Sequence, residues 1–109
     1  MANTFKLKTK ANVGESTVGI YTAPASTTTV VIGITLANTS GSGVNVGVGI
    51  TRAGTTEDVK LLKNAPIPQG SSLEFMAGNK VVLEETDTVV VDSDTNNSVD
   101  ASLTIMEIT

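Results

Sequence analysis

The chain has 109 residues, a net charge of −4 at pH 7, no cysteine, no histidine and three aromatic residues, which are Phe5, Tyr21 and Phe75. This length fits one domain. The absence of histidine and cysteine excludes Ser-His-Asp and Cys-His catalysis as well as zinc sites of the Cys/His type. A net acidic chain with so few aromatic side chains is also a poor candidate for nucleic-acid binding.

No apolar segment approaches the roughly 20 residues of a membrane-spanning helix, and residues 1–10 lack the apolar core of a secretory signal. Charge is unevenly distributed, with six basic and three acidic residues in positions 1–63 but one basic and eight acidic residues in positions 64–109. This asymmetry fits orientation on a charged partner surface and equally fits ordinary solvated loops. We expect a single domain over residues 1–109 and no membrane contact.

Short segments rich in Val, Ile and Thr alternate with clusters of Gly, Pro, Asn, Asp and Ser, and no segment has helical periodicity. The pattern predicts strands at about residues 4–13, 17–22, 28–37, 44–52, 58–63, 72–76, 80–84, 87–92 and 98–108. The predicted fold class is all-β, an antiparallel two-sheet β-sandwich of about 8–9 strands, with jelly-roll or Ig-like topology.

The first segment is amphipathic, with apolar or small residues on one face and three lysines on the other. Phe5, Leu7, Thr9, Ala11 and Val13 are expected to share one face of a strand, with Lys6, Lys8 and Lys10 on the other. Residues 1–13 are therefore expected to form either an edge strand or an extended arm that docks elsewhere.

Two runs in the middle of the chain alternate almost without error. Val30, Ile32, Ile34 and Leu36 form the first apolar face, and Val44, Val46, Val48 and Ile50 form the second. The loop at residues 38–43 contains only residues that suit tight turns, which predicts a hairpin. The other face of this hairpin has small side chains, among them Gly33, Thr35, Gly47 and Gly49, and we expect another chain to pack against it.

Later in the chain, the segment at residues 64–70 contains two prolines and is expected to cross from one sheet to the other. Val99, Ala101, Leu103 and Ile105 then alternate as regularly as the central runs, which predicts one buried strand face at the end of the chain.

The acidic segment at residues 92–100 was compared with a calcium-binding loop. Asp or Asn oxygens occur at suitable positions, but Asn97 stands where the loop needs glycine and Leu103 where it needs a bidentate glutamate. The pattern favours a hairpin loop in which Asp and Asn cap their own backbone. Glu84 and Glu85 are adjacent, but a glycosidase pair needs a substrate groove, normally lined by aromatic side chains. We therefore expect no enzyme activity, no catalytic residues, no metal and no cofactor.

Residues 17–109 resemble small virion proteins of tailed bacteriophages. The resemblance begins in Ile20–Thr39, where Tyr21-Thr22-Ala23-Pro24, a short polar turn and an alternating strand lead into Asn38-Thr39-Ser40. It continues through segments 67–74, 80–84, 87–91 and 103–108. The chain departs from the pattern at Glu85-Thr86-Asp87, where a glycine is usual before the aspartate.

This resemblance implies a β-sandwich structural protein of a phage particle, first of all a capsid decoration (cement) protein that binds and stabilises the assembled shell. A neck or tail component, such as an adaptor or baseplate protein, is the alternative. The expected partners are the major capsid protein or another virion protein and further copies of the chain, with a trimer favoured. The expected location is the capsid exterior, after synthesis in the host bacterial cytoplasm.

A carbohydrate-binding sandwich is the alternative from another class, and it would need an exposed aromatic platform, for which only Tyr21 is available. For the virion role, the expected interface residues are Phe5, Lys6, Lys8 and Lys10 as a docking arm, and Gly33, Thr35, Gly47 and Gly49 as a packing face.

Overall fold

The computed structural model describes residues 3–52, 58–75 and 80–109, and within these ranges the regular secondary structure is entirely β. The strands are β1 (Asn3–Val13), β2 (Val18–Thr22), β3 (Thr28–Asn38), β4 (Val44–Thr51), β5 (Asp58–Ile67), β6 (Ser72–Phe75), β7 (Val81–Leu83), β8 (Thr88–Ser93) and β9 (Val99–Ile108). Each strand expected from the sequence is present. The largest difference between a predicted and an observed strand end is in β5, which was expected to end at residue 63 and extends to Ile67.

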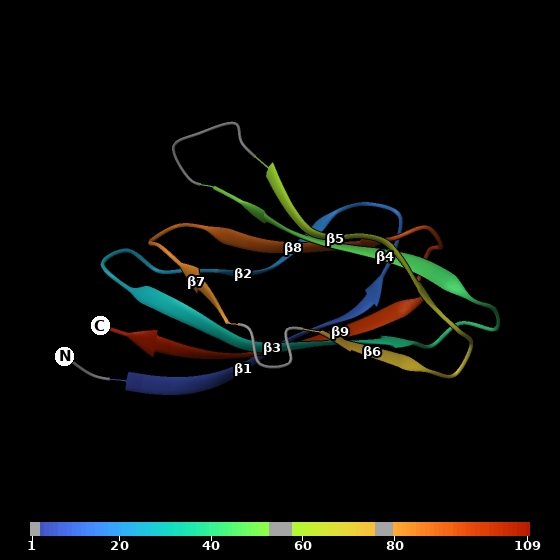
Figure 1. Ribbon diagram of the computed structural model, residues 1–109, viewed down its shortest axis with the longest axis horizontal. Coiled ribbons are helices and arrows are strands. Elements are labelled where there is room, and N and C mark those ends of the chain that lie inside the picture. Colours follow the sequence, from blue (N-terminus) through green and yellow to red (C-terminus); the bar gives the residue numbers. More distant parts are fainter. Residues whose placement is uncertain (1–2, 53–57, 76–79) are drawn as a thin grey trace.

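The strands form two antiparallel sheets that lie as layers one above the other (Figure 1). Sheet A has the strand order β1-β9-β3-β6, with β7 also pairing with β3, and sheet B has the order β2-β8-β4-β5. The two-sheet β-sandwich is therefore confirmed. The strand order is that of a jelly roll in which β6 and β7 together take the place of one strand, which decides between the two predicted topologies.

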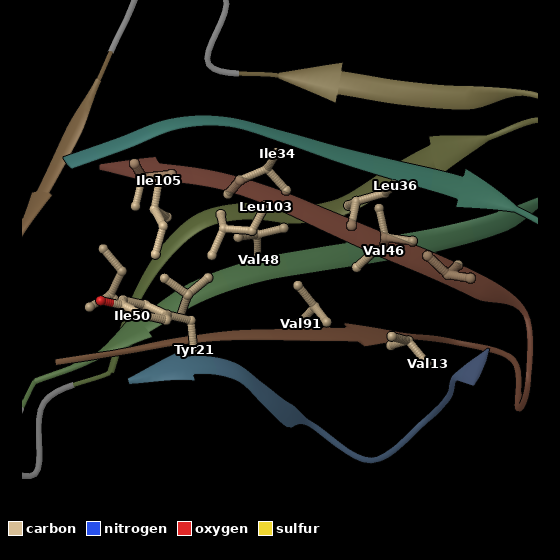
Figure 2. Packing of buried hydrophobic residues seen from close by; sticks show 14 of the residues in the cluster. Val13, Tyr21, Ile34, Leu36, Val46, Val48, Ile50, Val91, Leu103 and Ile105 are labelled. Atoms are coloured by element: carbon tan, nitrogen blue, oxygen red, sulfur yellow. The ribbon is translucent and has the colours of Figure 1, made fainter. Parts of the chain in front are cut away.

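The core lies between the sheets and consists of aliphatic side chains and Tyr21 (Figure 2). The alternation predicted in β4 and β9 is confirmed, because Val46 and Val48 in sheet B face Leu103 and Ile105 in sheet A as fully buried side chains. Burial of aliphatic side chains is the main favourable contribution to the stability of such a sandwich.

The predicted alternation in β3 is wrong in its first half. The register shifts between Val31 and Gly33, so that Val31 pairs with Ile105 and Gly33 with Thr104. Such a bulge places one extra residue in the strand and reverses the side-chain alternation. Val31 is buried, whereas Val30 and Ile32 are only half-buried and lie on the outer face of sheet A.

The predicted hairpin between the two central runs is also wrong, because β3 belongs to sheet A and β4 to sheet B. The buried Asn38 organises this crossing: its amide nitrogen donates to the carbonyls of Ser42, at 2.8 Å, and of Ile67, at 2.9 Å. Its side-chain oxygen accepts hydrogen bonds from the backbone nitrogen and hydroxyl of Ser40. The loop between β3 and β4 therefore connects the two sheets and does not join neighbouring strands of one sheet.

The second predicted crossing is confirmed, since β5 lies in sheet B and β6 in sheet A. Pro66 is already inside β5, opposite Asn45. This position tolerates proline because β5 is an edge strand and needs no donor on its free side.

Candidate interaction surfaces

The lysines of β1 lie on one face of the strand, and Phe5 and Leu7 lie on the other, as the sequence predicts. Lys6, Lys8 and Lys10 pair with Ile105, Leu103 and Ala101, and directly opposed residues of an antiparallel pair project from the same face. The lysines therefore lie on the core side of sheet A, at its edge, where a lysine can keep its ammonium group in water.

Phe5 and Leu7 are consequently on the outer face of sheet A, with 69 % and 65 % of their surface exposed. A register shift between Lys10 and Val13, with Asn12 at a φ of 59°, reverses the alternation again. Val13 therefore reaches the core, on the opposite face from Phe5 and Leu7, and the prediction that all three share one face is wrong. Of the two alternatives for residues 1–13, the structure has the edge strand rather than the extended arm, because β1 pairs with β9 along most of its length.

The four residues predicted to form one smooth packing face lie on two sheets. Gly33 and Thr35 are on β3 in sheet A, whereas Gly47 and Gly49 are on β4 in sheet B. The prediction of one shared face is wrong because it depended on the hairpin, which does not form.

Gly47 and Gly49 are also buried within this chain and are not exposed to a partner. A Cβ atom at Gly47 would lie 2.7 Å from Asp92 Oδ1 and 3.3 Å from the Leu62 carbonyl, and one at Gly49 would lie 2.7 Å from the Val59 carbonyl. The cause is the irregular register of β5 against β4, which brings carbonyls of β5 over β4. A side chain at position 47 or 49 therefore requires the neighbouring strands to shift.

A shallow hollow of about 300 Å³ lies at one end of the outer face of sheet A. Small side chains on three neighbouring strands line it, chiefly Thr9 on β1, Ser102 on β9 and Thr35 on β3, and Lys10 and Asp100 lie at its margin. The other end of this face carries the bulkier Phe5 and Leu7. Gly33, between the two ends, has open space where a side chain would be.

A buried polar cluster joins the two sheets near the end of the core. Tyr21 on β2 donates to Glu107 Oε2 at 2.6 Å, and because its single proton is used there, the Thr29 hydroxyl donates to Tyr21 at 2.8 Å. Lys6 Nζ binds Glu107 Oε1 at 2.8 Å. Glu107 is only 6 % exposed, so this carboxylate holds the edge strand β1 and the opposite sheet at once. No sequence pattern indicated the cluster, because its members are up to a hundred positions apart.

The contacts within this cluster shift the pKa values of Glu107 and Tyr21. Hydrogen bonds from Lys6 and then from Tyr21 lower the pKa of Glu107 below its ordinary value. Burial, followed by the hydrogen bond to Glu107, raises the pKa of Tyr21 to about 12.

The near-ultraviolet absorbance of the folded protein is therefore expected to show tyrosine ionisation at about pH 12 rather than at the ordinary value of 10.0. Tyr21 is the only tyrosine in the chain, so the titration measures this group alone. The neutral phenol is favoured in the folded state, and its contribution to stability should decline as pH rises from 10 towards 12. A transition near pH 10 in protein that circular dichroism shows to be folded would contradict this assignment.

The burial of Tyr21 removes the feature on which the carbohydrate-binding alternative depended. Its side chain is 7 % exposed and its ring points into the core (Figure 2). A sugar-binding platform needs an aromatic face in contact with solvent, so Tyr21 cannot provide one.

The aspartates of residues 92–100 accept hydrogen bonds from other segments. Asp92 accepts from the Thr17 hydroxyl at 3.2 Å, Asp94 from the Asn45 backbone at 3.1 Å and Asp100 from the Asn12 backbone at 3.0 Å. Asp94 and Asp100 therefore cap backbone groups of β4 and β1, and the prediction that they cap the backbone of their own loop is wrong. Within residues 3–52, 58–75 and 80–109, no group of three or more His, Cys, Asp or Glu residues is arranged to hold a metal ion.

The part of the chain that the structure describes also contains no helix long and apolar enough to cross a membrane.

The comparisons with known proteins find a similarity in structure. No family model matches the chain, and no curated protein matches it. A solved structure from the work "Bacillus endospore appendages form a novel family of disulfide-linked pili" is similar with a TM-score of 0.57 and 16 % identity, over 99 % of this chain and 87 % of that one. At this identity the likeness shows a shared fold.

Proposed function

We propose that this chain is a non-enzymatic structural subunit of a tailed-phage particle, a capsid decoration protein that binds the outside of the shell and stabilises it. The observation that carries the proposal is β1, a long edge strand with one partner strand, β9, and with three lysines and no acidic residue. A free edge strand offers a row of backbone donors and acceptors, and the lysines select an acidic partner surface.

The fold and the resemblance in residues 17–109 support the same proposal. Jelly rolls are a common architecture of viral capsid domains, although a fold alone does not define a function. A shell presents many copies of one site, so modest affinity for each copy is sufficient when the bound protein bridges neighbouring subunits.

Purified protein mixed with undecorated capsids is expected to sediment with them and to raise their melting temperature. Lys8→Gln should weaken binding about threefold at low ionic strength and much less at high salt, because a partly exposed charge contributes about 0.2–1 kcal/mol. Lys60→Gln makes the same change on β5, at the edge of sheet B, and should bind like the unmodified protein. Protein that stays in the supernatant and leaves capsid melting unchanged would refute the proposal.

A second candidate is a filament subunit, which the structural similarity to the pilus protein favours. That protein belongs to pili described as disulfide-linked, whereas this chain has no cysteine. A filament of this chain would therefore be held by non-covalent contacts, and the protein alone would polymerise when concentrated.

A further inference from the structure

The edge strand β1 has two lysines on the core side of sheet A whose charges are not neutralised by the part of the chain that the structure describes. Lys6 Nζ binds Glu107 at 2.8 Å. Lys8 and Lys10 form no ion pair with any described residue. Lys8 is half-buried and Lys10 is exposed. Because they are two positions apart, they project from the same face of β1, next to its free edge.

These inward-facing lysines limit which strands can add to the edge of β1. A free strand edge has backbone donors and acceptors that any extended segment can pair with, and inward-facing charges are one means by which proteins prevent such pairing. An uncharged strand beside β1 would cover Lys8 and Lys10 without supplying a counter-charge, which is unfavourable. The edge therefore excludes neutral strands and accepts a strand that carries carboxylates.

A second copy of this chain does not supply such a strand. Its own β1 would place lysines next to lysines, which is unfavourable across paired strands. Among the described strands at sheet edges, which are β1, β2, β5, β6 and β7, none has two acidic residues at alternate positions. The strand that fits the edge of β1 must therefore come from a different protein.

The outer face of β1 adds a second requirement at the same place. Thr9 lies between the two lysines in sequence, points to the outer face of sheet A and lines the hollow of about 300 Å³ together with small side chains of β9 and β3. A residue opposite Thr9 on an added strand would project from this outer face, beside the hollow. A large apolar side chain there would fill space that the small side chains leave open. Pockets for alternate side chains give such strand additions their specificity.

We propose that the free edge of β1 binds, as an additional strand, an extended segment of a partner protein in which two acidic residues flank one large apolar residue. The two carboxylates face Lys8 and Lys10 on the core side, and the apolar side chain lies over the hollow. Backbone hydrogen bonds to β1 supply most of the affinity, and the three side chains select the segment. That the partner is a virion protein rests on the proposed function, whereas the chemistry of the segment rests on β1 alone.

The probe is a synthetic peptide with blocked ends, Ser-Thr-Glu-Phe-Glu-Thr-Ser, titrated into the isotopically labelled full chain. Backbone amide signals of β1 are expected to shift at low ionic strength, and those of β5, at the edge of sheet B, to stay in place. The peptide with Gln in place of both Glu residues should bind about threefold to tenfold more weakly, since partly exposed ion pairs contribute modestly. High salt should remove this difference. Ala in place of Phe should weaken binding at least about threefold.

Two further comparisons test the backbone pairing and the lysines separately. Alternate residues of a strand direct their amide groups to opposite edges. Of two peptides methylated on one or the other set of alternate backbone nitrogens, only the one whose methyl groups face β1 should lose binding. The double variant Lys8→Gln/Lys10→Gln should lose the preference for the acidic peptide. The matched control Lys60→Gln/Lys63→Gln, which removes the same charge from β5, should keep it.

Equal binding of the acidic and neutral peptides at low salt would overturn the proposal, as would signal shifts that inorganic phosphate reproduces or equal effects of the two methylated peptides. Shifts in β1 that depend on protein concentration alone would place a second copy at this edge and would also overturn it. Capsid binding without peptide binding would refute the strand addition alone. Peptide binding without capsid binding would refute only the proposed function.

Discussion

Gly49→Ala is expected to lower the free energy of unfolding by about 1–3 kcal/mol, the usual range for forcing an extra methyl group into a packed site. The new Cβ atom would lie 2.7 Å from the backbone carbonyl of Val59, a distance that real Cβ atoms essentially never show. The obstacle is backbone, so β5 as a whole must shift to make room. Among the described strands β5 pairs with β4 alone, so we expect its end near Asp58 to detach first.

Gly33→Ala is the matched control for that substitution. Gly33 also lies within a strand, but nothing is within 4 Å of the position of its Cβ atom. Alanine there should leave the free energy of unfolding unchanged or raise it by up to about 1 kcal/mol, because it reduces the conformational freedom of the unfolded chain. Urea unfolding of both variants measures the difference, and equal stability of the two would show that β5 does not press on Gly49.

Glu107→Gln is expected to lower the free energy of unfolding at pH 7 by about 1–3 kcal/mol, because hydrogen bonds to a charged group contribute more than neutral ones. The neutral amide forms no ion pair with Lys6, and it offers one acceptor oxygen to Lys6 and Tyr21 where the carboxylate has two. Both β1 and the contact between the sheets should loosen, which hydrogen exchange along β1 would detect.

The same variant should alter the response to acid. The pKa of Glu107 is lower in the folded protein than its ordinary value of 4.5. Its contribution is therefore complete above pH 4.5 and is lost as pH falls through the folded-state pKa. Glu107→Gln should remove that part of the acid sensitivity, whereas Glu15→Gln, at an exposed position, should retain it. An unchanged dependence on pH in Glu107→Gln would show that the carboxylate is not coupled to folding.

The strands were predictable because their signals are local. Strict alternation in β4 and β9, bounded by turn residues, predicts both the strand and its buried face, and the structure has both. Asn38, the last residue of β3, and Pro68, the first residue after β5, likewise mark places where the chain leaves a strand. Such signals depend on neighbouring residues alone and therefore survive without knowledge of the tertiary structure.

The interaction surfaces were less predictable, because they depend on register and on which strands pair. One bulge in β3 and another near Asn12 in β1 each reverse the alternation, and no residue pattern marks them. The prediction that Phe5 and Val13 share one face of β1 failed for this reason. Phe5 and its partner residue Met106 are 101 positions apart, so the exposed apolar surface that they share exists only once β1 and β9 are adjacent.

Taken alone, the sequence determined an all-β chain, nearly all of its strand positions and the buried faces of β4 and β9. The absence of histidine and cysteine also excluded several kinds of chemistry. The tertiary structure alone decided that β3 and β4 lie in different sheets, that the glycines of β4 are covered by β5, and that Glu107 joins the sheets. The physical reason is that alternation in the sequence indicates only that one face of a strand is buried. Bulges and long-range strand pairing decide which face is buried and which segments cover the opposite face.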